Sequence, residues 1–167
     1  GVQTCALPIY QGNPDNDLEK GFLAYLDNQD EVDWYWENGT ELMRVNFGIS
    51  YNGGLNTFQP DFIVRFKNGK VGIFDTKPIG YRVEDTKVKA EALFEYVEGI
   101  NFNRGYAPKV IGGIVVKQGS QYLYYLGREY HDFNENHADW KNFNDLLFEI
   151  NTDLEAKKRV EEFAKAC

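Results

Sequence analysis

One stretch decides the fold of this chain: Gln59–Lys77, with the sequence QPDFIVRFKNGKVGIFDTK. Two runs of β-branched and aromatic residues flank the pair Asn68-Gly69, which is typical of a β-hairpin turn. We therefore expect two antiparallel strands joined by a tight loop. The acids Asp61 and Asp75 lie within this stretch, where a buried strand would carry apolar residues.

The length of the loop decides which face of the sheet each acid occupies. A two-residue loop ending at Gly69 would place Asp61 opposite Thr76 and put the two acids on opposite faces, because side chains alternate along a strand. A three-residue loop that begins at Lys67, with Gly69 in the left-handed conformation, would place Asp61 opposite Asp75. We favour the three-residue loop, because it pairs apolar residues with apolar residues on both faces.

An acidic pair in this register would need a positive charge beside it. Directly opposed residues have Cβ atoms about 4.5–5.5 Å apart, and two carboxylates so close repel each other. A divalent cation between Asp61 and Asp75 would relieve that repulsion. Lys77 lies two residues beyond Asp75 and returns to the same face about 6.6 Å along the strand.

The composition predicts one soluble domain. The chain has 167 residues, of which 43% are hydrophobic, enough to bury a core. No apolar run approaches the roughly 18 residues of a membrane span. The two cysteines, Cys5 and Cys167, do not make a disulfide framework and favour the reducing cytoplasm. His131 and His137 are too few for a zinc site.

The first nine residues look like the translation of a common sequencing-adapter oligonucleotide and lack an initiator Met. We expect residues 1–9 to be an artefact outside the fold, as tags and fusion scars are. Residues 10–167 would then form a single domain, the C-terminal fragment of a larger protein.

The remaining periodicity predicts alternating helices and strands. Helices are expected over residues 18–28, 84–98 and 140–166, with Gly99 ending the second. Its buried stripe would be Val88, Ala92, Leu93, Tyr96 and Val97. Besides the hairpin, strands are expected over residues 32–37, 44–51, 109–117 and 121–126. We assign four aromatic residues to packing and no chemistry: Trp34, Trp36, Phe47 and Tyr51. The order predicts an α/β fold with a mixed sheet flanked by helices.

Pro60-Asp61, followed after the hairpin by Asp75-Thr76-Lys77, resembles the PD-(D/E)XK nuclease signature in its Asp-X-Lys form. Over about residues 17–126 the chain is similar to the C-terminal endonuclease domain of type III restriction enzyme large subunits and related helicase-nucleases. The resemblance implies a restriction-endonuclease-like αβββαβ core, metal-dependent DNA cleavage and a helicase/ATPase domain upstream. Some relatives carry Gln-x-x-x-Tyr on the second helix, but here Ala92 stands four residues before Tyr96.

The same resemblance implies roles for five residues. Asp61 and Asp75 would bind Mg²⁺ directly, with Mn²⁺ as a substitute, and the Thr76 backbone carbonyl would be a third ligand. Glu19, on the first helix, would contribute directly or through water, although an acid in a first turn is also favoured by the helix dipole alone. Lys77 would orient or deprotonate the attacking water, or stabilise the pentavalent phosphorane. The sign of the shift in its pKa stays open at this point, because nearby acids and burial act in opposite directions.

The local charge predicts contact with nucleic acid. Residues 60–90 carry seven Lys or Arg and four acids, inside a chain of net charge −8. We expect Arg82, Lys87 and Lys89 to contact DNA, without excluding RNA. Because the whole chain is acidic and phosphate contacts dominate such affinity, most of the grip would come from an attached domain.

Three other interpretations use the same residues. Asp75 and Lys77 can form a plain surface ion pair, worth about 0–1 kcal/mol. The domain can be an inert nuclease fold that docks nucleic acid or a helicase. A carboxylate-pair hydrolase acting on sugars ranks last, because it would leave Lys77 without a role and an inverting pair needs a wider separation.

Overall fold

The computed structural model describes residues 3–4, 17–38, 46–105, 109–125 and 127–167. Within these residues the helices are α1 (Asp17–Asp27), α2 (Val83–Arg104) and α3 (Phe143–Ala166). The strands are β1 (Gln3–Thr4), β2 (Val32–Glu37), β3 (Ile49–Tyr51), β4 (Asn56–Phe58), β5 (Phe62–Phe66), β6 (Val71–Thr76), β7 (Val110–Gln118), β8 (Gln121–Tyr125) and β9 (Trp140–Asn142). The predicted α/β fold with a mixed sheet and flanking helices is confirmed.

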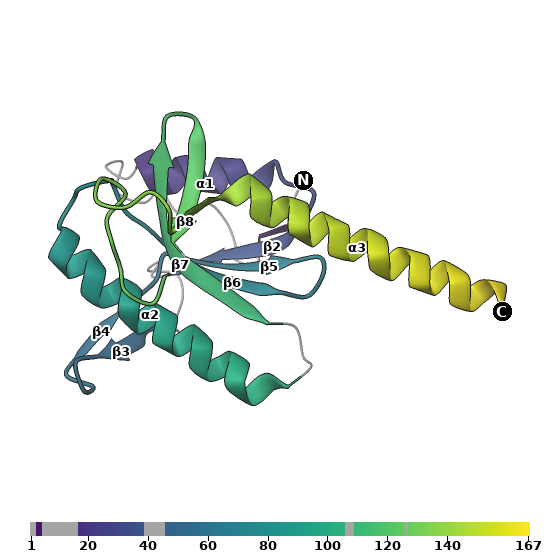
Figure 1. Ribbon diagram of the computed structural model, residues 1–167, viewed down its shortest axis with the longest axis horizontal. Coiled ribbons are helices and arrows are strands. Elements are labelled where there is room, and N and C mark those ends of the chain that lie inside the picture. Colours follow the sequence, from purple (N-terminus) through teal and green to yellow (C-terminus); the bar gives the residue numbers. More distant parts are fainter. Residues whose placement is uncertain (1–2, 5–16, 39–45, 106–108, 126) are drawn as a thin grey trace.

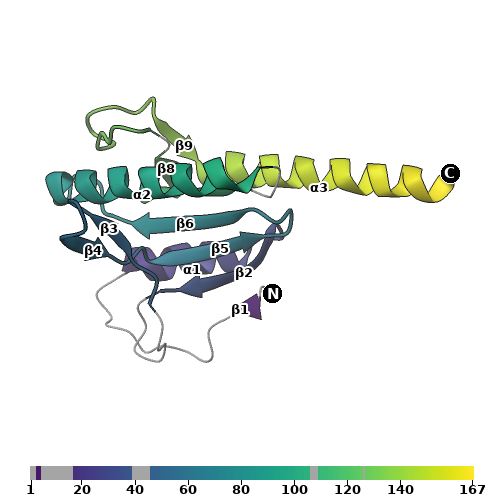
Figure 2. The ribbon, with the colours of Figure 1, turned by 90° about the horizontal axis from the view of Figure 1, so that it is seen from below.

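One mixed sheet forms the centre of the molecule, with the strand order β1-β2-β5-β6-β7-β8-β9. Figure 2 shows the part from β1 to β6. The β1–β2 and β6–β7 pairs are parallel, and the other neighbours are antiparallel. Strands β3 and β4 form a separate hairpin. Strand β1 lies within the nine residues set aside as an artefact; its pairing does not test where that segment comes from, so that expectation stays a prediction.

The central hairpin has the predicted register. Phe62 pairs with Phe74 and Ile63 with Ile73, as a three-residue loop requires. The Gly69 amide donates to the Phe66 carbonyl at 2.9 Å, and Gly69 has φ +92°, a conformation that costs glycine little. Extending the register by one residue places Asp61 opposite Asp75.

The two faces of the sheet carry different helices (Figure 1). Helix α1 and the first half of α3 cover one face, where the buried residues include Phe22, Phe62, Phe74, Tyr124 and Phe143. Helix α2 covers the other face and contacts β7 and β3. Its buried apolar side chains, Ala90, Leu93 and Val97, pack in the clusters that contain Ile73 and Ile114. Burial of these apolar surfaces, at about 25 cal/mol per Å², holds the layers together.

Several predicted boundaries were wrong. Helix α2 continues through Gly99 to Arg104, because Val97 and Ile100 pack on the β3–β4 side of the core, and this packing outweighs the roughly 1 kcal/mol that an internal glycine costs. Val88, predicted to be buried, is exposed. Residues 140–142 form β9 rather than helix, with Trp140 paired to Tyr125.

Two further boundaries differ for other reasons. Strand β3 begins at Ile49, whereas the prediction began at residue 44; residues 44 and 45, like residue 126 at the end of another predicted strand, lie outside the described residues. Helix α3 begins after Asn142, whose side chain accepts from the Asn144 amide at 2.9 Å. This is an ordinary N-cap, and it explains why the helix does not start at Trp140.

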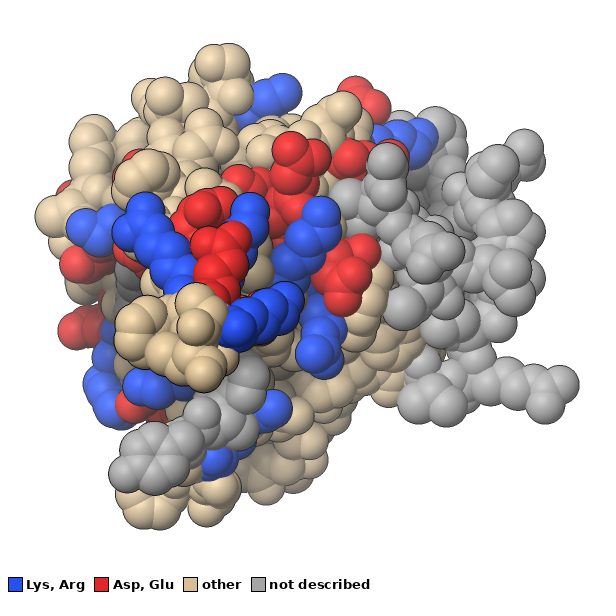
Figure 3. Space-filling view, turned by 90° about the vertical axis from the view of Figure 1, so that its right-hand side faces the viewer, with Lys and Arg blue, Asp and Glu red and all other residues tan. Residues whose placement is uncertain are grey.

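The second half of α3 projects away from the sheet (Figures 1 and 2), and residues 155–167 are exposed. Figure 3 faces the end of the molecule toward which α3 projects and shows Lys and Arg side chains mixed with Asp and Glu. Such mixing is typical of a solvated surface. Within the described residues, no helix combines the length and apolar character needed to cross a membrane.

Candidate functional site

The acid pair opens into a hollow of about 460 Å³ at the carboxyl end of β6, which we call the acid hollow. It is lined by Tyr51, Thr57, Phe58, Gln59, Asp61, Asp75, Lys77 and Lys89. The register of the hairpin brings Asp61 to Asp75, and strand alternation turns Lys77 to the same side. The structure therefore brings together the three residues of the predicted signature.

Asp61 is held by the end of the neighbouring strand. Its Oδ2 accepts hydrogen bonds from the Thr76 amide and from Thr76 Oγ1, both at 2.7 Å. Two donors on one carboxylate oxygen limit the rotation of the side chain. Thr76 thus orients Asp61, a role that the sequence did not indicate.

Asp75 and Lys77 form an ion pair with 2.5 Å between Asp75 Oδ2 and Lys77 Nζ. The acid is 2% exposed and the amine 22% exposed, so this is not the plain surface ion pair considered from the sequence. Lys77 Nζ also donates to the Thr76 carbonyl at 3.3 Å. That carbonyl, predicted to be a metal ligand, therefore faces the ammonium in this structure.

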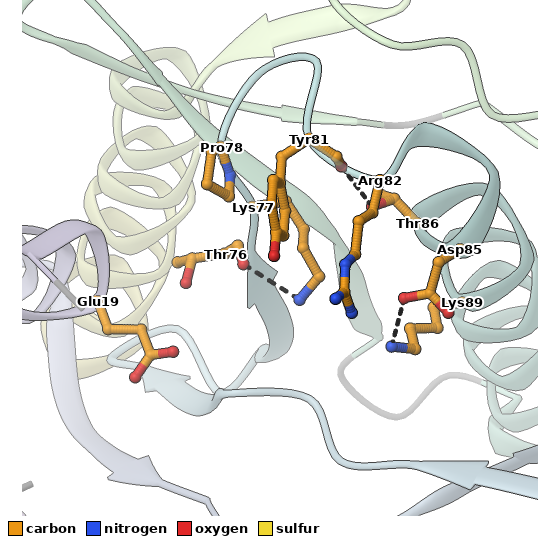
Figure 4. Close-up of a pocket in the computed structure, with 9 residues that line it drawn as sticks. All are labelled: Glu19, Thr76, Lys77, Pro78, Tyr81, Arg82, Asp85, Thr86 and Lys89. Atoms are coloured by element: carbon orange, nitrogen blue, oxygen red, sulfur yellow. Dashed lines mark hydrogen bonds and ion pairs between the residues drawn. The ribbon is translucent and has the colours of Figure 1, made fainter. Parts of the chain in front are cut away.

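A second hollow of about 410 Å³ adjoins the first, and we call it the basic hollow (Figure 4). Glu19 reaches it from α1 and Lys89 from α2. Lys77, directly after β6, and Arg82, directly before α2, extend into it as well. The rest of its lining is Thr76, Pro78, Tyr81, Asp85 and Thr86. Lys77 and Lys89 line both hollows, so the two form one continuous site.

The three predicted nucleic-acid contacts do not lie together. Arg82 and Lys89 line the basic hollow. Lys87 lines neither hollow; its Nζ lies 2.6 Å from Glu91 Oε1 and 3.8 Å from Glu129 Oε1. Residues two apart on a helix point in nearly opposite directions. Because Lys89 of α2 faces the site, Lys87 must point away from it.

The site concentrates negative charge. Burial raises the pKa of Asp75 to about 7, and repulsion from Asp61 adds to the shift. Burial also raises the pKa of Glu19 to about 7, with further repulsion from Asp61, Glu37 and Asp75. Burial lowers the pKa of Lys77, but the attraction of Asp75, Asp61 and Glu19 more than offsets this, so the net shift is upward. Lys77 is therefore an ammonium at neutral pH.

Glu37 and Tyr51 were assigned no site role from the sequence. Glu37 lines neither hollow but acts electrostatically on Glu19 and Asp61. Burial raises the pKa of Glu37, and Asp61 adds repulsion; Glu37 ends β2 and pairs with Phe62, the residue after Asp61. Tyr51 lines the acid hollow from the β3–β4 hairpin, and its ring contacts Phe58 edge-on with centroids 6.1 Å apart. In the sequence, the only sign for Glu37 was that it ends a predicted strand. Nothing in the local sequence distinguished Tyr51 from a residue that only packs.

The donor set fits a hard cation bound by two carboxylates. Within the described ranges, no group of three or more His, Cys, Asp or Glu residues is placed to hold a metal ion. Mg²⁺ needs fewer, because it is usually held by one or two carboxylates, with water and substrate phosphate as the other ligands. Asp61 and Asp75 supply the two carboxylates. Burial is the main cause of the raised pKa of Asp75, and a bound cation would neutralise the repulsion from Asp61 that adds to the shift.

A Glu19→Gln variant tests this electrostatic description. The folded pKa of Glu19 lies above its ordinary value of 4.5, so the native state retains a proton that the unfolded chain releases as the pH rises from about 4.5 to 7. This lowers the free energy of unfolding over that range. Glu19 is half-buried, so solvent screens part of this effect. We therefore expect the free energy of unfolding to fall by about 1–2 kcal/mol less in the variant than in the wild type over this pH range.

Urea unfolding at pH 5 and pH 7.5 measures this difference. Glu161→Gln, on the exposed half of α3, is the matched control and should follow the wild type. Identical pH dependence in Glu19→Gln and the wild type would contradict the electrostatic environment described for Glu19.

Comparison with known proteins adds no further constraint. A scan against protein-family models, a search of curated proteins and a search of solved structures each find no match to this chain. The function of the chain is therefore inferred from the geometry of the two hollows.

Proposed function

We propose that this domain is a metal-dependent nuclease that hydrolyses phosphodiester bonds of DNA. The observation that carries the proposal is the convergence of Asp61, Asp75 and Lys77 in the acid hollow. Two carboxylates and an ammonium on one surface match what phosphodiester hydrolysis needs: anchors for a hard cation and a positive group near the phosphate.

Each residue has a definite task in this proposal. Asp61, oriented by Thr76, and Asp75 would hold Mg²⁺, or Mn²⁺ in its place. The ion, when bound, lowers the pKa of water and neutralises charge on the phosphate. Lys77 is charged at neutral pH because its pKa is raised, which favours donating hydrogen bonds to the water or to the phosphorane over removing a proton. Glu19, in the adjoining hollow, would contribute through water.

Contact with DNA would come from the cations along the two hollows. Lys77, Arg82 and Lys89 converge on the basic hollow, and positive side chains there would attract the phosphate backbone. The chain as a whole has a net charge of −8, which opposes tight binding by this domain alone. We therefore also propose an attached helicase/ATPase domain, as in restriction-type helicase-nucleases, that supplies most of the affinity.

The proposal predicts that Lys77→Met lowers Mg²⁺-dependent cleavage of DNA by about 10²–10³-fold, because a preorganised charge beside the phosphate is worth that much in other hydrolytic sites. Methionine keeps the length of the side chain and removes its charge. Cleavage of a supercoiled plasmid and of a labelled RNA of similar length, each with Mg²⁺ and with EDTA, measures activity and substrate class together.

Lys67→Met is the matched control, because Lys67 is an exposed lysine in the loop of the same hairpin, and it should cleave like the wild type. Circular dichroism melts show whether Lys77→Met is folded at the assay temperature. Equal cleavage by the folded Lys77→Met variant would remove Lys77 from the mechanism. A wild-type protein that cleaves neither substrate would favour the inert docking module instead.

A further inference from the structure

Arg82 has an unusual backbone conformation at the edge of the basic hollow. Its φ and ψ are 43° and 53°, in the left-handed region that non-glycine residues rarely adopt. Residues held in this conformation are strained, and they cluster at functional sites. In this conformation the guanidinium points into the basic hollow beside Lys77 and Lys89 (Figure 4).

Arg82 differs from the other two cations in its partners. Lys77 is paired with Asp75 at 2.5 Å, and Lys89 with Asp85 at 2.7 Å. Arg82 forms no ion pair with any residue that the structure describes, and its guanidinium lies 5.4 Å from the centre of the Tyr81 ring. A guanidinium of this kind is suited to bind a phosphate through two parallel hydrogen bonds.

The bend that carries Arg82 is held from two sides. Asp132, 3% exposed, accepts from the Gly80 amide at 3.0 Å through Oδ1 and from the Asn134 amide at 3.1 Å through Oδ2. On the other side, the amide of the buried Thr86 donates to the Arg82 carbonyl at 2.9 Å. A buried carboxylate is therefore used to order the residues just before Arg82.

We infer that the basic hollow is a phosphate subsite centred on Arg82, and that Asp132 is its positioning residue. The inference rests on the proposed function: the subsite holds the phosphate next to the one that is cleaved. Lys77 and Lys89 line both hollows, so a single strand can pass from one hollow to the other. The ligand is a phosphate group, either an internal phosphodiester or the terminal monophosphate of a strand.

Binding without cleavage tests the subsite separately from the catalytic proposal. The probe is a fluorescein-labelled eight-nucleotide oligothymidylate in EDTA, with and without a 5′-phosphate, followed by anisotropy. We expect Arg82→Gln to weaken binding about tenfold and to reduce the salt dependence by about one phosphate contact. Arg65→Gln, at an exposed arginine on β5, is the control and should bind as the wild type does.

Neutral linkages locate the phosphate that Arg82 contacts. A methylphosphonate placed at each position in turn should abolish the Arg82→Gln penalty at one internal linkage. If Arg82→Gln loses affinity only for the 5′-phosphorylated strand, the subsite binds the terminal phosphate of a strand. Equal binding by Arg82→Gln and Arg65→Gln on both probes would overturn the inference, even if the protein cleaves DNA. A tenfold loss in a protein that shows no cleavage would support the subsite and reject the proposed function.

The role of Asp132 is tested by non-additivity. Asp132→Ala should weaken binding of the same probe severalfold, and Asp132→Ala combined with Arg82→Gln should bind no worse than Arg82→Gln alone. Asp132→Asn, whose amide oxygen can still accept from the Gly80 amide, should recover most of the affinity and also serves if the alanine variant does not fold. Additive losses in the double variant built on Asp132→Ala would show that Asp132 does not act through Arg82. An Asp132→Asn variant that itself loses affinity severalfold, with a loss that adds to that of Arg82→Gln, would show the same.

Discussion

Replacing Asp75 with asparagine is expected to abolish Mg²⁺-dependent cleavage while stabilising the fold above pH 7. Asp75 is 2% exposed, and its pKa is raised to about 7 from an ordinary value of 3.8. Between these two pH values the folded state holds a proton that the unfolded chain releases, so the free energy of unfolding falls as the pH rises through the window. A shift of this size corresponds to about 4 kcal/mol at most. Asparagine keeps the shape of the protonated acid and removes the titration.

The Asp75→Asn variant should gain stability above pH 7 but lose activity. Asparagine has a neutral amide oxygen where the proposal requires a charged ligand, so we expect cleavage to fall by about 10³-fold or more. Calorimetry with Mn²⁺ should lose the binding heat of the wild type. We expect the variant to be more stable than the wild type at pH 8, similar in stability at pH 5, and inactive. This result would show that the negative charge of Asp75 destabilises the fold but is required for cleavage.

Asp33→Asn is the matched control for this experiment. Asp33 is an exposed acid near the start of β2, at the other end of that strand from Glu37, and it should change neither cleavage nor the pH dependence of unfolding. Retained cleavage in Asp75→Asn would contradict the proposed mechanism. Lower stability than the wild type at pH 8 would show instead that the ion pair with Lys77 outweighs the burial of Asp75.

The hairpin and its acid pair could be predicted from the sequence because the information is local. The alternation of apolar residues on both sides of Asn68-Gly69 admits few registers, and only one pairs Phe62 with Phe74, as observed. Once that register is chosen, the neighbouring positions of Asp61 and Asp75 follow from strand geometry alone.

The rest of the site depends on contacts between distant segments. The direction in which α2 packs decides that Lys89 faces the site and Lys87 does not. The predicted buried stripe of this helix correctly included Leu93 and Val97 but wrongly included Val88, so it did not fix the direction of the neighbouring lysines. Tyr51 enters the acid hollow because the β3–β4 hairpin packs beside α2. The order that Asp132 gives to the bend before Arg82 spans 52 residues of sequence. No local pattern carries such information.

Glu19 illustrates a partial success. Its place on the first helix was predicted, and Phe22, one turn later, anchors α1 to the aromatic core. The helix therefore brings Glu19 near the acids strongly enough to shift its pKa. Yet Glu19 lines the basic hollow rather than the acid hollow. A role through water fits this placement better than direct ligation.

The largest expected effect on the fold comes from Gly113→Ala in β7. A Cβ atom at this position would lie 2.2 Å from the backbone carbonyl oxygen of Tyr125 in β8, far inside van der Waals contact, and a backbone atom cannot move aside as a side chain can. Strand β7 lies between β6 and β8, so the clash would separate strands in the middle of the sheet. We expect a loss of about 3 kcal/mol or more.

Gly99→Ala is the matched control, because a Cβ atom there meets nothing within 4 Å and Gly99 lies inside α2. Alanine should stabilise this helix by about 0.5–1 kcal/mol. Urea unfolding of both variants measures the contrast. Since Gly113 pairs with Phe74, the residue before Asp75, the Gly113→Ala variant should also lose cleavage under conditions in which it remains partly folded. A Gly113→Ala protein as stable as the wild type would contradict the close approach of β7 and β8, and with it the sheet geometry that positions Asp75.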